Sequence, residues 1–140
     1  MTTDLVAMNA FLAEPRNAMV AAIRSDGRPQ MTPNWFLWTD GRFYISTTKA
    51  RVKYRLFRRD PRIQLAIDDS TGFRYVVVNG LVEIADDVDQ GLPYFRALRH
   101  KHGRDEQSDD ELRAEMIRDE RVLLVVTPEN PQAEWLCHGF

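Results

Sequence analysis

One short segment concentrates the side chains that could bind an anion. The stretch STTKARVKYRLFRRDPR, residues 46–62, holds seven lysines and arginines in seventeen positions. The whole chain of 140 residues has 19 basic and 21 acidic side chains, which gives a formal net charge of −2. A local block of positive charge therefore needs its own explanation. Three are open: a solvated helix face, a nucleic-acid surface, or a site for a discrete anion such as phosphate.

The spacing of the block helps to separate these explanations. Wound as an α-helix, the segment places Arg51, Arg55 and Arg58 on one flank, with Val52 and Leu56 as an apolar stripe beside them. A nucleic-acid surface usually spreads its positive charge further and raises the pI above about 9. Here the pI is about 5.9, and the segments DDVDQ and DEQSDDE would repel a polyanion. A compact anion site explains the inner cations, and solvation explains the outer arginines.

Hydroxyl groups lie directly before the basic block. Ser46, Thr47 and Thr48 stand where a strand is expected to turn into the helix. Hydroxyls, the free N–H groups of a helix start and adjacent basic side chains are the groups that bind phosphate. The sequence therefore predicts a phosphate site at this turn.

The elements that must position this site are mainly strands. Residues 18–24, 30–38 and 42–48 are predicted to form a three-stranded meander, because Asp26-Gly27 and Asp40-Gly41 are hairpin signals. Pro33 cannot donate a hydrogen bond, so we expect a bulge or a sheet edge there. The basic helix should end before Pro61.

Further strands are predicted at residues 63–68, 74–85 and 121–128, with a bulge or bend at Gly80. Helices are predicted at residues 93–101 and after the capping box that begins at Ser108, where Leu112 and Met116 share one face. The last twelve residues should be irregular or form one short strand. These elements predict a mainly β fold, a small β-barrel with short helices, in a single domain over residues 1–140.

Composition narrows the class of protein. No run of eighteen apolar residues and no basic leader segment is visible, and Cys137 is the one cysteine, so we expect a cytoplasmic protein without a membrane partner. His100 and His102 are two positions apart and should point away from each other, which makes a poor metal pair. No catalytic acid or base stands out. That fits either hydride transfer, which mainly needs close positioning, or a binder without turnover.

At these residues the chain resembles the pyridoxamine 5'-phosphate oxidase-like, FMN-binding split-barrel family, and within it the coenzyme F420-dependent reductase branch of actinobacteria. The resemblance covers roughly residues 5–128. Its matching segments, in chain order, are DGRPQMTPNWF, YISTTKARVKYR, RRDPR and GFRYVVVNG.

The resemblance implies a cofactor phosphate at the turn after the third strand. Hydroxyls would come from Ser46 and Thr47 and charge from Arg51 and Lys53, while Arg55 is a lesser candidate for the cofactor tail.

The resemblance also implies that the second strand runs along the cofactor ring. The backbone of four residues would meet its pyrimidine edge: Met31, Thr32, Pro33 and Asn34. Phe73 would reach across a dimer interface onto the partner's cofactor, or else pack in the core. Four further residues are candidates for the substrate pocket or the barrel core: Met19, Trp35, Phe36 and Trp38.

The function implied is a homodimeric, coenzyme F420-dependent oxidoreductase. It would transfer a hydride between the reduced deazaflavin and a small unsaturated or quinone-like substrate, with no nucleic-acid partner and no metal. One alternative is an FMN-dependent oxidase or reductase of the same fold. An alternative of another class is a non-catalytic cofactor or lipid carrier.

Overall fold

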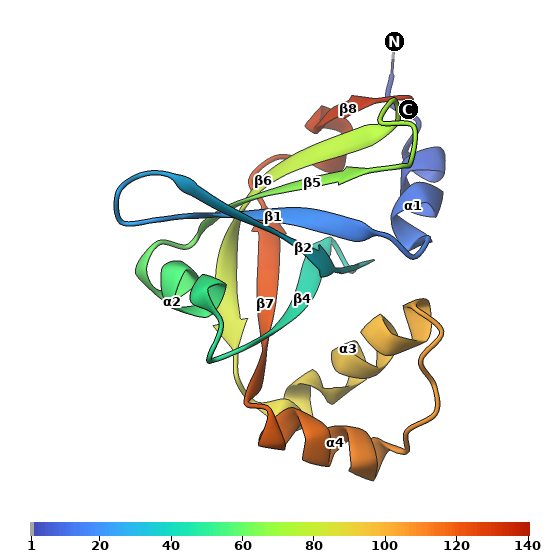
Figure 1. Cartoon of the computed structure of the whole chain (residues 1–140). Helices are drawn as coiled ribbons and strands as arrows, with labels where there is room; N and C mark the ends of the chain where they lie inside the picture. The colour runs from blue at the N-terminus through green and yellow to red at the C-terminus, as the bar shows by residue number, and fades with distance from the viewer. Residues whose placement is uncertain (1) are drawn as a thin grey trace.

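Eight strands form one antiparallel sheet in the computed structural model, which describes residues 2–140 (Figure 1). The strands are β1 (Asn17–Ile23), β2 (Pro29–Trp35), β3 (Leu37–Thr39), β4 (Arg42–Thr48), β5 (Arg62–Asp68), β6 (Tyr75–Ala85), β7 (Arg121–Pro128) and β8 (Leu136–His138). The helices are α1 (Leu5–Ala13), α2 (Val52–Arg59), α3 (Val88–Lys101) and α4 (Asp109–Arg118), and a short 3₁₀ helix spans Gln132–Glu134. The predicted β-barrel with helices is confirmed.

The sheet curls because the chain joins its two ends directly. The strand order is β2-β1-β5-β6-β7-β4-β3, with β8 beside β6. Phe36 alone separates β2 from β3 and is fully buried. β2 and β3 are the two edge strands of this order, yet one residue separates them in sequence, so the sheet must close on itself. β2 pairs with β1, and β4 pairs with β3 and β7. The two facing strands β2 and β4 have no ladder between them, which leaves the barrel split there.

The predicted meander is therefore wrong in one respect. Residues 30–38 are not one strand, because burial of Phe36 turns the chain and sends β3 to β4 on the far side of the split. The two hairpins themselves are confirmed, and Gly27 and Gly41 have φ values of 86° and 74°, the left-handed region that glycine favours.

The helices α3 and α4 cover the outer face of β4 and β7. On β4, Phe43 and Ile45 face the barrel core, whereas Tyr44 packs with the helices. On β7, Leu124 faces the core and Leu123 faces the helices. Both strands are consequently apolar on both faces, as a sheet covered on each side requires.

Side-chain caps determine where α3 and α4 begin, and the helices differ from the prediction in two respects. The capping box of Ser108 is confirmed. α3 begins at Val88 because Asp87 caps it, which leaves Pro93 inside the helix. α1 was not predicted: its sequence LVAMNAFLA is apolar on nearly all sides and lacks helical periodicity. Among residues 2–140, no helix has the length and apolarity needed to span a membrane.

Pro33 and Gly80 lie in unbroken ladders, so no bulge forms at either. Pro33 lies on β2, at the end of the strand order, and the predicted sheet edge is confirmed. Gly80 lies opposite Pro128, at one end of the β6–β7 ladder. A Cβ at position 80 would come within 2.8 Å of both the Thr127 carbonyl oxygen and Val126 Cγ1. Glycine is needed here for close approach of two strands.

We expect Gly80→Ala to lower the free energy of unfolding by about 1–3 kcal/mol, because the added methyl group overpacks a backbone contact that cannot move aside. Urea denaturation followed by circular dichroism measures this change. Glu83→Ala, at an exposed position on the same strand, is the control and should change stability by less than about 0.5 kcal/mol. Equal effects of the two substitutions would contradict the close-packing explanation.

Candidate cofactor and substrate site

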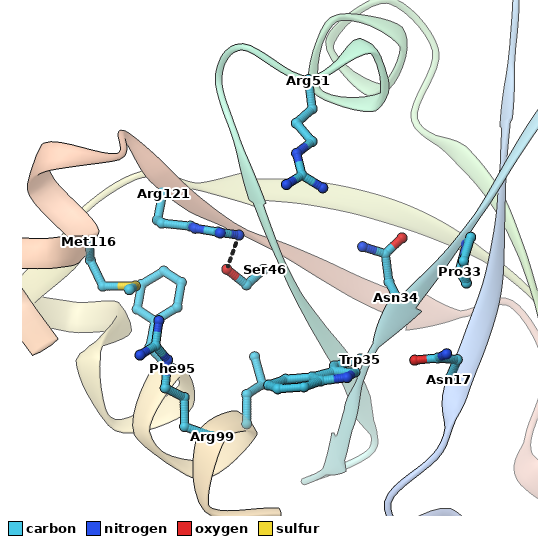
Figure 2. A pocket seen from close by; sticks show the side chains of 11 residues that line it. Asn17, Pro33, Asn34, Trp35, Ser46, Arg51, Phe95, Arg99, Met116 and Arg121 are labelled. Atoms are coloured by element: carbon cyan, nitrogen blue, oxygen red, sulfur yellow. Dashed lines mark hydrogen bonds between the residues drawn. The ribbon is translucent and has the colours of Figure 1, made fainter. Parts of the chain in front are cut away.

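Two hollows open at the split, one on each side of the Arg51 side chain. The first, which we name the inner pocket, has a volume of about 310 Å³ and lies between the split and the helices α3 and α4 (Figure 2). The second, the outer groove, has a volume of about 610 Å³ and runs from β2 to the start of α2. Pro33 and Arg51 line both. A ligand bound along β2 can therefore occupy both hollows.

Lys53 is the buried cation of the outer groove. Only 5% of its surface is exposed, and Nζ donates to Asn34 Oδ1 at 2.6 Å. This neutral amide is the one hydrogen-bond partner of Nζ among residues 2–140. Burial, together with the weaker repulsion from Arg51 and Arg121, lowers the pKa of Lys53 to about 8. A buried ammonium with two free N–H donors is suited to an anionic ligand.

The first turn of α2 adds backbone donors beside Lys53. Arg51 is the N-cap residue, and no side chain caps this helix. The first amides of a helix have no partners within the helix. From this position the Arg51 guanidinium extends toward the space between Ser46 and Asn34 (Figure 2). An anion at the helix start would meet free amides and two cations together.

Arg121 brings a third cation from the first position of β7. Its Nη1 lies 3.4 Å from Ser46 Oγ, and its Nε is buried without a partner. Burial lowers the pKa of Arg121, and the charge of Arg51 acts in the same direction. No ion pair engages Arg51, Lys53 or Arg121 in the described part of the chain. These three residues form what we name the cation cluster, a site that fits an anionic group such as a cofactor phosphate.

Comparison with known proteins agrees with this geometry. The family model described as pyridoxamine 5'-phosphate oxidase matches residues 6–133. The chain belongs to this family. Its members bind flavins or coenzyme F420 and are mostly oxidoreductases.

Three solved structures illustrate the range of proteins to which the chain is similar. An F420 reductase is 27% identical with a TM-score of 0.71, over 87% of this chain and 93% of that one. A conserved hypothetical protein from Mycobacterium tuberculosis is 20% identical with a TM-score of 0.80, over 93% and 83%. The haem storage protein HutZ from Vibrio cholerae is 13% identical with a TM-score of 0.65, over 96% and 94%. The last two show the shared fold.

The structure gathers most of the residues predicted to contact a cofactor. Those that line the inner pocket are Pro33, Asn34, Ser46 and Arg51. Those that line the outer groove are Thr32, Pro33, Arg51 and Lys53. Their roles in binding stay predictions of the family resemblance.

Four predicted residues line neither hollow: Met31, Thr47, Arg55 and Phe73. Thr47 is buried and its Oγ1 has no partner. Neighbouring residues of a strand point to opposite faces, so the hydroxyls of Ser46 and Thr47 do not converge. Thr48, on the same face as Ser46, lines the outer groove instead. Phe73 is 72% exposed at the β5–β6 turn.

Arg121 was not among the residues predicted to form the site. It lies 75 positions from Ser46 and opens a strand whose other residues are nearly all apolar, so no local pattern marks it.

Trp35 was expected in the core or substrate pocket. It lines the inner pocket and stacks on His102 of the α3 C-terminus, with ring centroids 3.9 Å apart and planes 5° apart. His100 instead contacts Asp105, so the two histidines do not converge.

We expect the affinity for a phosphate-bearing cofactor to fall as the pH rises above about 8. The pKa of Lys53 in the free protein is about 8, and a bound anion favours its charged form, so binding above that pH requires proton uptake. The loss approaches about tenfold per pH unit for one proton. Fluorescence titrations with F420 and FMN from pH 7 to 9.5 measure it. The same pH slope in Lys53→Met as in the wild type would contradict this assignment.

Proposed function

We propose that this protein is a homodimeric oxidoreductase that uses coenzyme F420 to reduce a small unsaturated or quinone-like substrate. The observation that carries the proposal is the pair of Arg51 and Lys53 within the cation cluster, which forms no ion pair within residues 2–140 and adjoins the uncapped start of α2. Such a site fits a cofactor phosphate. The similarity to an F420 reductase at 27% identity favours the deazaflavin over FMN.

The chain's own residues divide the work of binding. In the outer groove, Lys53 and Arg51 supply charge, and Thr32 and Thr48 supply hydroxyls for the phosphate. The backbone of β2 runs between the outer groove and the inner pocket. Its edge position leaves one side of the strand free of ladder hydrogen bonds, and those groups can meet the polar edge of a ring.

Reduced F420 supplies a hydride when bound. The protein must then hold an acceptor close by and keep water away. The inner pocket has apolar walls from the helices for this purpose: Phe95 and Leu98 of α3 and Met116 of α4. No general acid or base is needed for the positioning itself, which agrees with the absence of a catalytic dyad from the residues that line the pocket.

An apolar row on the outside of the sheet supports a homodimer. Strand register places five residues directly opposite one another across β8, β6, β5, β1 and β2: Leu136, Val77, Ala66, Met19 and Pro33. The neighbours of Val77, Ala66 and Met19 along their strands face the core, whereas the neighbours of Pro33 line the two hollows. Leu136 is 64% exposed, and Phe73, Met31 and Leu81 add exposed apolar surface. Surfaces of this kind mark association sites, and a two-fold dimer would bury the row against its copy.

We expect the wild-type protein to sediment as a dimer at micromolar concentration and Leu136→Asp to sediment as a monomer, because the substitution places a charge in the apolar row. Ile117→Asp, at an exposed apolar position on α4, is the matched control and should remain dimeric. Sedimentation equilibrium measures both, with circular dichroism to verify folding. A monomeric wild type would overturn the dimer.

We expect Arg51→Gln and Lys53→Met to weaken F420 binding about tenfold to hundredfold, since a charge-assisted hydrogen bond contributes roughly 1.5–3 kcal/mol. Arg58→Gln is the control. It lies on the same helix but lines neither hollow, and its effect should stay within about 0.5 kcal/mol. Fluorescence titration with F420 and, separately, FMN measures the affinities. Small and equal losses in all three variants would mean a diffuse cationic surface.

The same titrations distinguish the F420-dependent enzyme from its alternative, an FMN-dependent enzyme of the same fold. Tighter binding of FMN than of F420 would make the protein an FMN-dependent member of the family. Oxidation of bound, reduced F420 by a panel of quinones and conjugated carbonyl compounds separates an enzyme from a carrier. Tight binding without turnover across the panel would favour the carrier.

A further inference from the structure

Arg121 lines the inner pocket and forms no ion pair with any carboxylate within residues 2–140. Trp35, Phe95, Leu98 and Met116 give the same pocket apolar lining, and Figure 2 shows Phe95 and Met116 beside Arg121. Glu120, the neighbour of Arg121 in sequence, forms no ion pair with it within residues 2–140, and the next two carboxylates are engaged by other arginines. Glu115 pairs with Arg99, and Asp119 pairs with Arg118 at 3.0 Å.

The contact that Arg121 does make is weak. Its 3.4 Å approach to Ser46 Oγ is long for a hydrogen bond, and its Nε is buried with no acceptor. A partly buried guanidinium in this state has lost water without gaining an anion, which is costly. An anionic group in the inner pocket would remove that cost.

The position of Arg121 separates it from the cations assigned to the phosphate. Lys53 lines the outer groove alone, Arg121 lines the inner pocket alone, and Arg51 stands between them and lines both. A phosphate held at the start of α2 by Lys53 and Arg51 would leave Arg121 unneutralised. The inner pocket thus has room for a second anionic group.

We propose that the inner pocket binds the acceptor substrate by a carboxylate, that Arg121 receives this carboxylate, and that the substrate is a small planar acid. This inference rests on the proposed function and names its substrate class. The guanidinium fork matches a carboxylate with two parallel hydrogen bonds. Of the three arginines that line the inner pocket, Arg99 pairs with Glu115 and Arg51 also lines the outer groove, so Arg121 is the cation available to balance one negative charge. The volume of about 310 Å³ is at the lower end for ligand pockets, which suits a molecule of one or two rings.

The test compares an unsaturated aromatic acid with its neutral amide. Isothermal titration calorimetry measures cinnamate and cinnamamide binding to the full-length protein, with and without saturating F420. We expect the wild type to prefer the acid by about tenfold or more, as a charge-assisted pair implies. Arg121→Gln should abolish the preference and Arg121→Lys should retain part of it. Arg113→Gln, an exposed arginine of α4 that pairs with Asp89, should leave it unchanged.

The outcomes distinguish this inference from the proposed cofactor. No preference for the acid in the wild type would overturn the substrate class. A loss of F420 or FMN affinity of tenfold or more in Arg121→Gln would also overturn it, because Arg121 would then belong to the cofactor site. Preferential cinnamate binding that depends on Arg121, in a protein that binds neither F420 nor FMN, would support the subsite and refute the proposed function. Thermal unfolding verifies that each variant is folded.

Discussion

The site depends on how the barrel closes. Because Phe36 alone joins β2 to β3, strands at opposite ends of the sheet are held next to each other, yet β2 and β4 do not form a ladder. Lys101 secures this crossing. Its Nζ donates to the carbonyl oxygens of Phe36 and Leu12, at 2.9 Å and 2.7 Å, and lies 3.7 Å from the centre of the Phe36 ring. One half-buried side chain thereby connects α3, α1 and the crossing. The unpaired interval between β2 and β4 is where both hollows open.

The charges at the split between β2 and β4 make it suited to an anionic ligand. The cation cluster draws Arg51 and Lys53 from the start of α2 and Arg121 from the start of β7. Within residues 2–140, the side chains of the cluster donate hydrogen bonds only to the neutral groups of Asn34 and Ser46. Such an arrangement is unfavourable in a free protein and favourable around an anion. Any ligand that neutralises the cluster should consequently stabilise the fold as well as occupy the site.

The barrel itself does not decide the chemistry. An F420 reductase and a haem storage protein both share the fold, so function must be argued from the residues that line the split. In this chain the helices α3 and α4 contribute an apolar wall, and the stack of His102 on Trp35 joins the end of α3 to β2. The helices therefore shape the pocket as well as cover the sheet.

Features that depend on a few neighbouring residues could be predicted from the sequence. The two Asp-Gly hairpins, the capping box at Ser108 and the end of α2 before Pro61 each depend on a few adjacent residues, and all are confirmed. The basic block also identified Arg51 and Lys53 as neighbours of one turn. The sequence could not predict that residues 30–38 form two strands separated at Phe36, because this depends on which surface buries that ring.

Arg121 shows the same limit within the site. Its contact with Ser46 spans 75 positions and exists because β4 and β7 pair in one particular register. Sequence determined which groups were available to bind an anion, since side-chain chemistry and helix starts are local properties. Tertiary structure decided which of those groups meet, since strand pairing brings together residues that no local pattern connects.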